Sequence, residues 1–117
     1  MIEDKAKDLG RLIGQSSEYK AVKRASDTLN GDAETVALLQ KMEVLRMNAQ
    51  RMMQRGERPT EEMEHELDTL LNQVQGRATY QQLLVAQENF DKVMGKANDW
   101  ILEGIEKGAA SPIITLG

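Results

Sequence analysis

Apolar and polar residues alternate along most of this chain with the period of an α-helix. The longest such stretch runs from Thr79 to Lys107, where apolar residues return at alternating steps of four and three positions. The residues of this stripe are Thr79, Leu83, Ala86, Phe90, Val93, Ala97, Trp100 and Gly104. At about 100° per residue, the stripe widens to include Tyr80, Leu84, Met94, Ile101, Leu102 and Ile105. A stripe of this width predicts a long central helix that contacts more than one neighbour.

Shorter stretches with the same periodicity precede this one, and residues that cap or break helices separate them. They predict a short first helix that carries Ile2 to Ile13, a second that ends at about Leu29, a third from Ala33 to about Arg55 and a fourth that ends before Gly76. The N-cap candidates are Ser16, Ser17, Asp32 and Thr60. The turn from Arg55 to Pro59 separates the third predicted helix from the fourth. These signals predict an all-α chain.

The third predicted helix is apolar on two sides. Its main stripe consists of Leu38, Met42, Leu45, Ala49 and Met52. Val36 and Met47 lie about 160–180° from Leu38 at about 100° per residue. Because a helix that is apolar on two sides is contacted on two sides, we predict that Val36 and Met47 belong to a protein interface.

The predicted helices define one domain over residues 1–108, followed by a flexible C-terminal tail over residues 109–117. The chain has 117 residues, enough for one modest core, and it is 40% hydrophobic but only 3% aromatic. Gly108 and Pro112 are expected to end the last helix after Lys107. We therefore expect an elongated bundle of about four to five helices with a long C-terminal helix.

The length of the last predicted helix indicates a homodimer. A helix of ~30 residues is ~45 Å long, whereas a compact domain of this size is roughly 35 Å across. The helix would extend beyond its own domain with its apolar stripe uncovered, and a second copy of the chain would bury the uncovered part. The stripe residues predicted to lie in an interface are Phe90, Val93, Ala97 and Trp100.

Charge and cysteine content exclude several classes of function. The formal net charge is −4 at pH 7, so the chain as a whole does not favour nucleic acid or an anionic membrane as a partner. The absence of cysteine excludes disulfides, thiolate metal sites and a cysteine nucleophile. No signal peptide, membrane span, phosphate-binding glycine loop or nucleophile elbow is evident. We therefore predict a soluble cytoplasmic protein without cofactor or enzymatic activity.

One pair of residues has the spacing of metal ligands in helical bundles. Glu62 and His65 match the Glu-x-x-His pair of di-iron proteins. However, both are predicted to point about 100–160° away from the apolar stripe that contains Met63. Solvated charge on an acidic first helical turn explains these residues without a metal ion.

The segment around the turn is locally basic and then acidic. The basic residues singled out as a patch are Arg46, Arg51, Arg55 and Arg58. They could bind RNA phosphates, which makes an accessory RNA-binding module the alternative function. An acidic run from Glu61 to Asp68 follows the turn, and no aromatic residues that could stack on bases separate the arginines. We therefore favour ion pairs across an antiparallel hairpin over nucleic-acid binding.

With its helices assigned, the sequence resembles the bacterial YlbF/YmcA family, and most closely its YheA-like branch. The resemblance covers residues from about Leu9 to Ile105. The matching features are Ile13-Gly-Gln-Ser-Ser-Glu-Tyr19, Leu29 with Asp32, the Gln50-to-Pro59 end of the hairpin, Tyr80-x-x-Leu83-x-x-Ala86-Gln87-x-x-Phe90, Ile101 and Ile105. These are capping and packing positions, so the resemblance depends on their order and spacing.

The resemblance implies an all-α, dimer-forming protein of the bacterial cytoplasm that acts as a non-enzymatic regulator or adaptor. Members of the family act in competence, sporulation and biofilm formation, and some modulate messenger-RNA processing within a complex. It implies a protein partner, such as RNA-processing machinery, and no catalytic residues. Some members that form this complex have cysteines implicated in iron–sulfur binding, and this chain has none. The same cluster is therefore not expected here.

Overall fold

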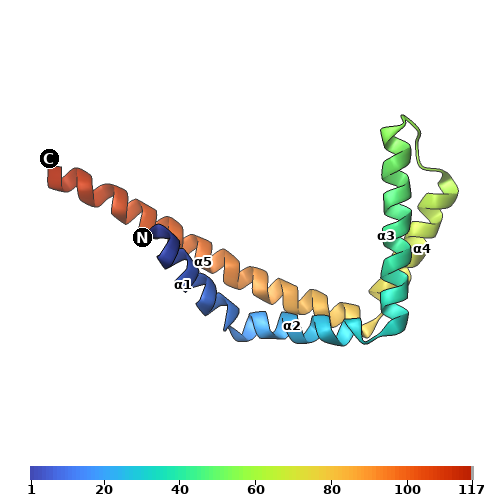
Figure 1. The fold of residues 1–117 in the computed structure, drawn as a ribbon, viewed down its shortest axis with the longest axis horizontal. Helices are drawn as coiled ribbons and strands as arrows, with labels where there is room; N and C mark the ends of the chain where they lie inside the picture. Colours follow the sequence, from blue (N-terminus) through green and yellow to red (C-terminus); the bar gives the residue numbers. More distant parts are fainter. Residues whose placement is uncertain (117) are drawn as a thin grey trace. The chain divides into compact units, whose positions relative to one another are not determined.

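The computed structural model describes the backbone of residues 1–116 and the side chains of residues 1–110. The regular elements in the described chain are α1 (Ile2–Gly14), α2 (Ser17–Asn30), α3 (Ala33–Gln54), α4 (Glu61–Gln75) and α5 (Ala78–Leu116), as Figure 1 shows. The prediction of an all-α fold with about four to five helices and a long C-terminal helix is confirmed.

Side-chain caps explain where three of these helices begin. The Ser16 hydroxyl oxygen accepts a hydrogen bond from the backbone N–H of Tyr19 at 3.2 Å, at the start of α2. Asp32 accepts from the N–H of Thr35 at 3.4 Å, and Thr60 accepts from the N–H of Met63 at 3.1 Å. Each bond satisfies a backbone donor that the first helical turn leaves without a partner. The predicted caps at Ser16, Asp32 and Thr60 are therefore confirmed.

The end of α5 differs from the prediction. The sequence predicted that the helix stops after Lys107, but the backbone stays helical to Leu116. Ala109 and Ala110 favour the helix, and a proline that removes one N–H does not by itself end it here. The side chains beyond Ala110 and the whole of Gly117 lie outside the described residues. The flexible tail over residues 109–117 and the single domain over residues 1–108 stay predictions.

The chain divides into two compact units, one formed by residues 1–21 with residues 86–117 and the other by residues 22–85. In the first unit, Ala86 and Ala97 are buried on α5. The rings of Tyr19 and Phe90 meet edge to face, with centroids 5.5 Å apart. No residue of α1 is fully buried, and its Leu9 and Ile13 are half-buried. The first unit therefore has a thin core.

In the second unit, α3 and α4 pack side by side as an antiparallel hairpin (Figure 1). We call the end where α3 begins and α4 ends the base, and the end at the connecting turn the tip. Leu70 and Val74 of α4 are buried near the base, whereas Met63 and Leu67 are only half-buried towards the tip. Gly56 in the turn has a φ of 78°, a left-handed conformation that glycine adopts without strain.

Candidate protein interface

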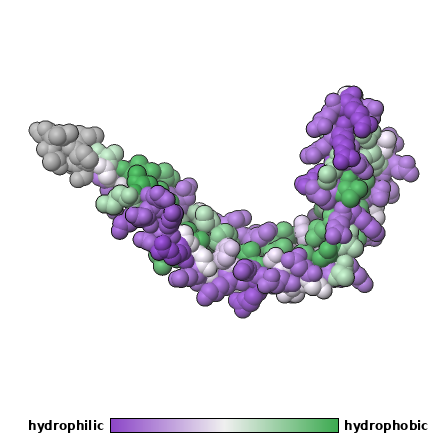
Figure 2. Space-filling view, viewed as in Figure 1, coloured by the Kyte–Doolittle hydropathy of each residue, from purple (hydrophilic) through white to green (hydrophobic). Residues whose placement is uncertain are grey.

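Residues 94–105 of α5 include several exposed large apolar side chains. We call them the α5 apolar surface; it consists of Met94, Trp100, Ile101, Leu102 and Ile105. Trp100 is 64% exposed and Ile105 is 60% exposed. Figure 2 shows apolar surface in green on the part of the molecule where α1 and α5 lie. Single exposed apolar residues are ordinary, but several large ones within about three helical turns are typical of a binding surface.

The structure separates the interface residues that the sequence predicted on α5. Phe90 and Val93 are half-buried and Ala97 is buried, while Trp100 is exposed. Phe90 contacts Tyr19 within the same unit, so part of its apolar surface already has a partner. The interface role of all four residues stays a prediction. Trp100 is the only one of the four whose side chain is exposed in the single chain. The other exposed residues of the surface were already part of the widened stripe in the sequence.

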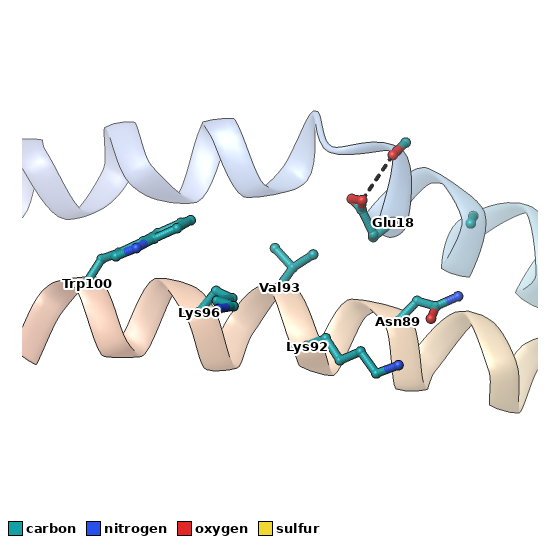
Figure 3. Close-up of a pocket in the computed structure, with 8 residues that line it drawn as sticks. Glu18, Asn89, Lys92, Val93, Lys96 and Trp100 are labelled. Atoms are coloured by element: carbon teal, nitrogen blue, oxygen red, sulfur yellow. Dashed lines mark hydrogen bonds between the residues drawn. The ribbon is translucent and has the colours of Figure 1, made fainter.

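A groove runs beside Trp100 between the start of α2 and the middle of α5. Ser17, Glu18 and Ala21 line it from α2, and Asn89, Lys92, Val93, Lys96 and Trp100 line it from α5. Figure 3 shows Val93 and Trp100 reaching from α5 towards the facing helices. The Ser17 hydroxyl donates a hydrogen bond to the Glu18 carboxylate at 3.2 Å. The groove is therefore lined by both apolar and charged side chains.

The second predicted interface lies on α3. Met47 is 44% exposed, and Val44 and Met53 of the same helix are exposed as well. Val36, in contrast, is half-buried near the base of the hairpin. The two residues therefore do not form one equally open surface, and their shared interface stays a prediction.

A longer groove follows one side of the α3–α4 hairpin, and we call it the hairpin groove. It consists of adjoining cavities that share Ala37, Lys41 and Leu45, so they are continuous along α3. Near the tip, Ala49 and Met63 line it, and further down Asn48 and Glu66 do. Sequence periodicity predicted the apolar stripe of α3 that contributes Leu45 and Ala49, but only the structure shows that α4 leaves one side of it open.

The arginines near the tip are not neutralised as the sequence predicted. Arg46 pairs with Glu43 of its own helix rather than with α4. Among the side chains of residues 1–110, no ion pair joins Arg51, Arg55 or Arg58 to the acidic run of α4. All three are exposed, whereas buried and half-buried apolar residues make the contact between α3 and α4. The expected ion pairs across the hairpin are therefore wrong, because charges on the outer faces of two packed helices do not meet.

At the base, a polar cluster that the sequence did not predict joins the starts of α3 and α5. The Arg77 guanidinium donates to the two carboxylate oxygens of Asp32 at 3.0 and 3.1 Å and pairs with Glu34 at 3.0 Å. Thr79 donates to Asp32 at 2.8 Å. Thr35, which is 0% exposed, donates to Asp32 at 2.6 Å and accepts from Arg77 at 2.9 Å.

These hydrogen bonds hold the Asp32 carboxylate in its charged form. The bonds from Thr35 and Thr79, with that from Arg77, keep the pKa of Asp32 well below its usual range. The bond to Asp32 likewise raises the pKa of Arg77. Only the capping role of Asp32 was visible in the sequence, because its other partners lie 45 and 47 residues away. The cluster is internally paired, and we assign it a structural role.

Glu62 and His65, the spacing-based metal candidates, are both exposed on α4. Within the described residues, no group of three or more His, Asp or Glu side chains is arranged to hold a metal ion. None of the helices, over the residues described, is long and apolar enough to cross a membrane.

These features define the class as a small helical protein with open apolar surfaces. The chain belongs to the family described as control of competence regulator ComK, YlbF/YmcA, whose model matches residues 2–106. The resemblance seen in the sequence is thereby confirmed for the family, while the YheA-like branch stays a prediction. The family is linked to the regulation of competence.

Relatives of the chain come from several bacteria. It is 25% identical over 105 residues to a UPF0342 protein of Limosilactobacillus reuteri. The matched region covers 90% of this chain and 85% of the relative. It is 25% identical over 111 residues to a UPF0342 protein of Bacillus licheniformis, with 95% of each chain covered. A UPF0342 protein of Streptococcus gordonii is 25% identical over 105 residues, covering 90% of this chain and 94% of the relative. None of these names, nor that of the family, describes an enzymatic activity.

Proposed function

We propose that this protein is a non-enzymatic homodimeric regulator that acts by binding other proteins. The description of its family names control of the competence regulator ComK, which supports a regulatory role. A regulator without catalysis acts through affinity, so its function depends on surfaces that the single chain leaves uncovered.

The observation that carries the proposal is the α5 apolar surface. Trp100, Ile101 and Ile105 are each exposed by 46% or more. Aromatic residues and a largely apolar centre are typical of the buried part of protein interfaces. Charged side chains such as Asp99 and Glu103 border this surface and are exposed too. An apolar centre with a polar rim is suited to a protein partner.

The proposal is tested by pull-down from the native host with mass spectrometry. Trp100→Glu should abolish recovery of the specific partner, because a charge would be buried unpaired in the interface. The matched control is Asp99→Asn, which changes an adjacent exposed residue outside the α5 apolar surface and should retain the partner. Equal recovery by both variants would show that the α5 apolar surface is not the binding site. Light scattering tests the homodimer, which should have twice the 13.1 kDa chain mass.

RNA binding is the second candidate, and one observation favours it. Arg51, Arg55 and Arg58 have no ion-pair partner among the described side chains. However, Glu57 and the acidic start of α4 lie beside them in the chain, so the tip carries both signs of charge. We expect no binding to generic RNA below ~100 μM at physiological salt. Micromolar binding that weakens steeply with salt would favour the RNA-binding function instead.

A further inference from the structure

We propose that a second copy of this chain occupies the hairpin groove. The two hairpins pack side by side as a four-helix bundle, with both tips at the same end; we call this the tip-to-tip orientation. The inference rests on the proposed homodimer and specifies its interface. In this arrangement, the α3 helix of each copy lies beside α4 of the other, and the arginines near the tip pair with the partner's acidic residues.

The hairpin resembles half of a bundle. The residues of the α3 apolar stripe, Leu38, Met42, Leu45, Ala49 and Met52, are all half-buried, and none is fully buried. On α4, only Leu70 and Val74 are buried. Two packed helices can cover each other on one side only, and helical domains normally bury such stripes by adding a further layer. The hairpin therefore requires a second layer to complete its core.

The hairpin groove has a shape that suits another pair of helices. It extends along α3 from Ala37 through Leu45 to Ala49. Helices pack by fitting the side-chain ridges of one into the grooves of another, and a groove that follows the seam of two helices can take such a ridge. A second hairpin supplies helices of the required length by definition.

Charge complementarity identifies the second copy as the occupant. Lys41, Val44 and Asn48 line the groove, and Arg51 and Arg55 continue their spacing of three and four residues on the same face of α3. The opposite wall is acidic, because Glu66 lines the groove and Glu62 lies one helical turn before it. Each hairpin therefore has a basic wall and an acidic wall near its tip, and these walls do not pair with each other within one chain.

The positions of these charges favour the tip-to-tip orientation. Ala49 and Met63 line the same end of the groove, so Arg51 lies at the level of the first turn of α4. With a two-fold axis parallel to the helices, Arg51 of one copy lies beside Glu62 of the partner subunit, and the symmetry repeats the pair. In the opposite orientation, Arg51 would instead approach the base of the partner hairpin, where Glu34, Lys41 and Arg77 line the groove. The carboxylates at the base already pair with Arg77 of their own chain, so that orientation gives Arg51 a less favourable partner than Glu62.

The first experiment is a charge swap followed by light scattering. Arg51→Glu with Arg55→Glu should raise the dimer dissociation constant by roughly tenfold or more, and Glu62→Arg with Glu66→Arg should do the same. Mixing the two variants should restore a dimer, because the reversed charges then pair across the interface. Circular dichroism checks that each variant is folded. The matched control is Arg46→Glu, which lies on the other side of the hairpin seam and should stay dimeric.

The second experiment tests orientation, and the cysteine-free chain makes it specific. A bismaleimide should crosslink Glu57→Cys at the tip into a covalent dimer, while a mixture of Glu57→Cys with Gln75→Cys at the base should give no tip-to-base product. A predominant tip-to-base product would overturn the proposed orientation.

If the Arg51/Arg55 variant of the first experiment stays as dimeric as the wild type, the hairpin is not the interface although the homodimer stands. A monomeric wild type would refute the homodimer itself.

Discussion

The base and the tip of the α3–α4 hairpin contain the same kinds of charged residue and use them differently. At the base, Arg77 makes two hydrogen bonds to Asp32 and an ion pair with Glu34. At the tip, Arg51 and Arg55 make no ion pair with the acidic residues of α4 among the described side chains. The difference does not come from composition, since both ends combine arginine with carboxylates.

The difference comes from whether one partner is held in place. Asp32 is fixed as the N-cap of α3, and hydrogen bonds from Thr35 and Thr79 hold its carboxylate. A held carboxylate matches the planar guanidinium fork without a large loss of side-chain entropy. No such anchor exists at the tip, where exposed pairs gain little from pairing. Opposite charges at the tip are thus available to a partner molecule, while those at the base are not.

The largest expected effect tests the packing at the base. Leu70→Ala removes a side chain that is only 7% exposed, so it should reduce the free energy of unfolding by about 2–5 kcal/mol. The adjacent Leu71 is 37% exposed, and Leu71→Ala should cost clearly less. Urea denaturation measures both values. Equal losses would show that the hairpin is not packed as described.

Removing the base arginine should have the next largest effect. Arg77→Gln leaves Asp32 without its guanidinium partner and removes a donor from buried Thr35, so the melting temperature should fall. Arg58→Gln at the tip removes an exposed arginine and should leave the melting temperature unchanged. Thermal unfolding followed by circular dichroism compares the two variants. A larger fall in melting temperature for Arg58→Gln than for Arg77→Gln would contradict the structural role that we assign to Arg77.

The pH dependence of stability should reflect the base cluster. The pKa of Asp32 is lowered in the folded state, while an unfolded aspartate has a pKa of about 3.9. The folded state therefore binds the proton less readily, so this contribution to stability is complete above about pH 5 and is lost as the pH falls below about 4. Asp32→Asn should lose less stability than the wild type between about pH 5 and pH 3. Identical losses in urea denaturation would exclude this role of Asp32.

The smallest expected effect compares the two helix caps. Thr60 caps α4 at the tip through a single bond to Met63, whereas the Asp32 cap belongs to a larger cluster. Thr60→Ala should reduce the free energy of unfolding by about 0.5–1 kcal/mol, the lower part of the range for lost caps. Thr60→Ser keeps the hydroxyl and should be close to wild type. If Thr60→Ser lost as much stability as Thr60→Ala, the hydrogen bond would not be the cause.

The sequence by itself determined the helices and most of their ends. Helical periodicity and the caps Ser16, Asp32 and Thr60 were sufficient because each bond involved joins residues within about one helical turn. The exception was the end of α5, where the pattern of Gly108 and Pro112 predicted a stop that the backbone does not make. The widened apolar stripe of α5 also contained every residue of its exposed surface.

Only the tertiary structure decided which of these residues are covered and which charges pair. Ala97 and Trp100 belong to the same stripe, yet the first is buried and the second is exposed. Arg77 finds Asp32 across 45 residues of chain, whereas Arg51 finds no partner in the nearby acidic run. The physical reason is that backbone hydrogen bonds in a helix are set by local sequence, whereas burial and ion pairing depend on which surfaces the path of the chain brings together.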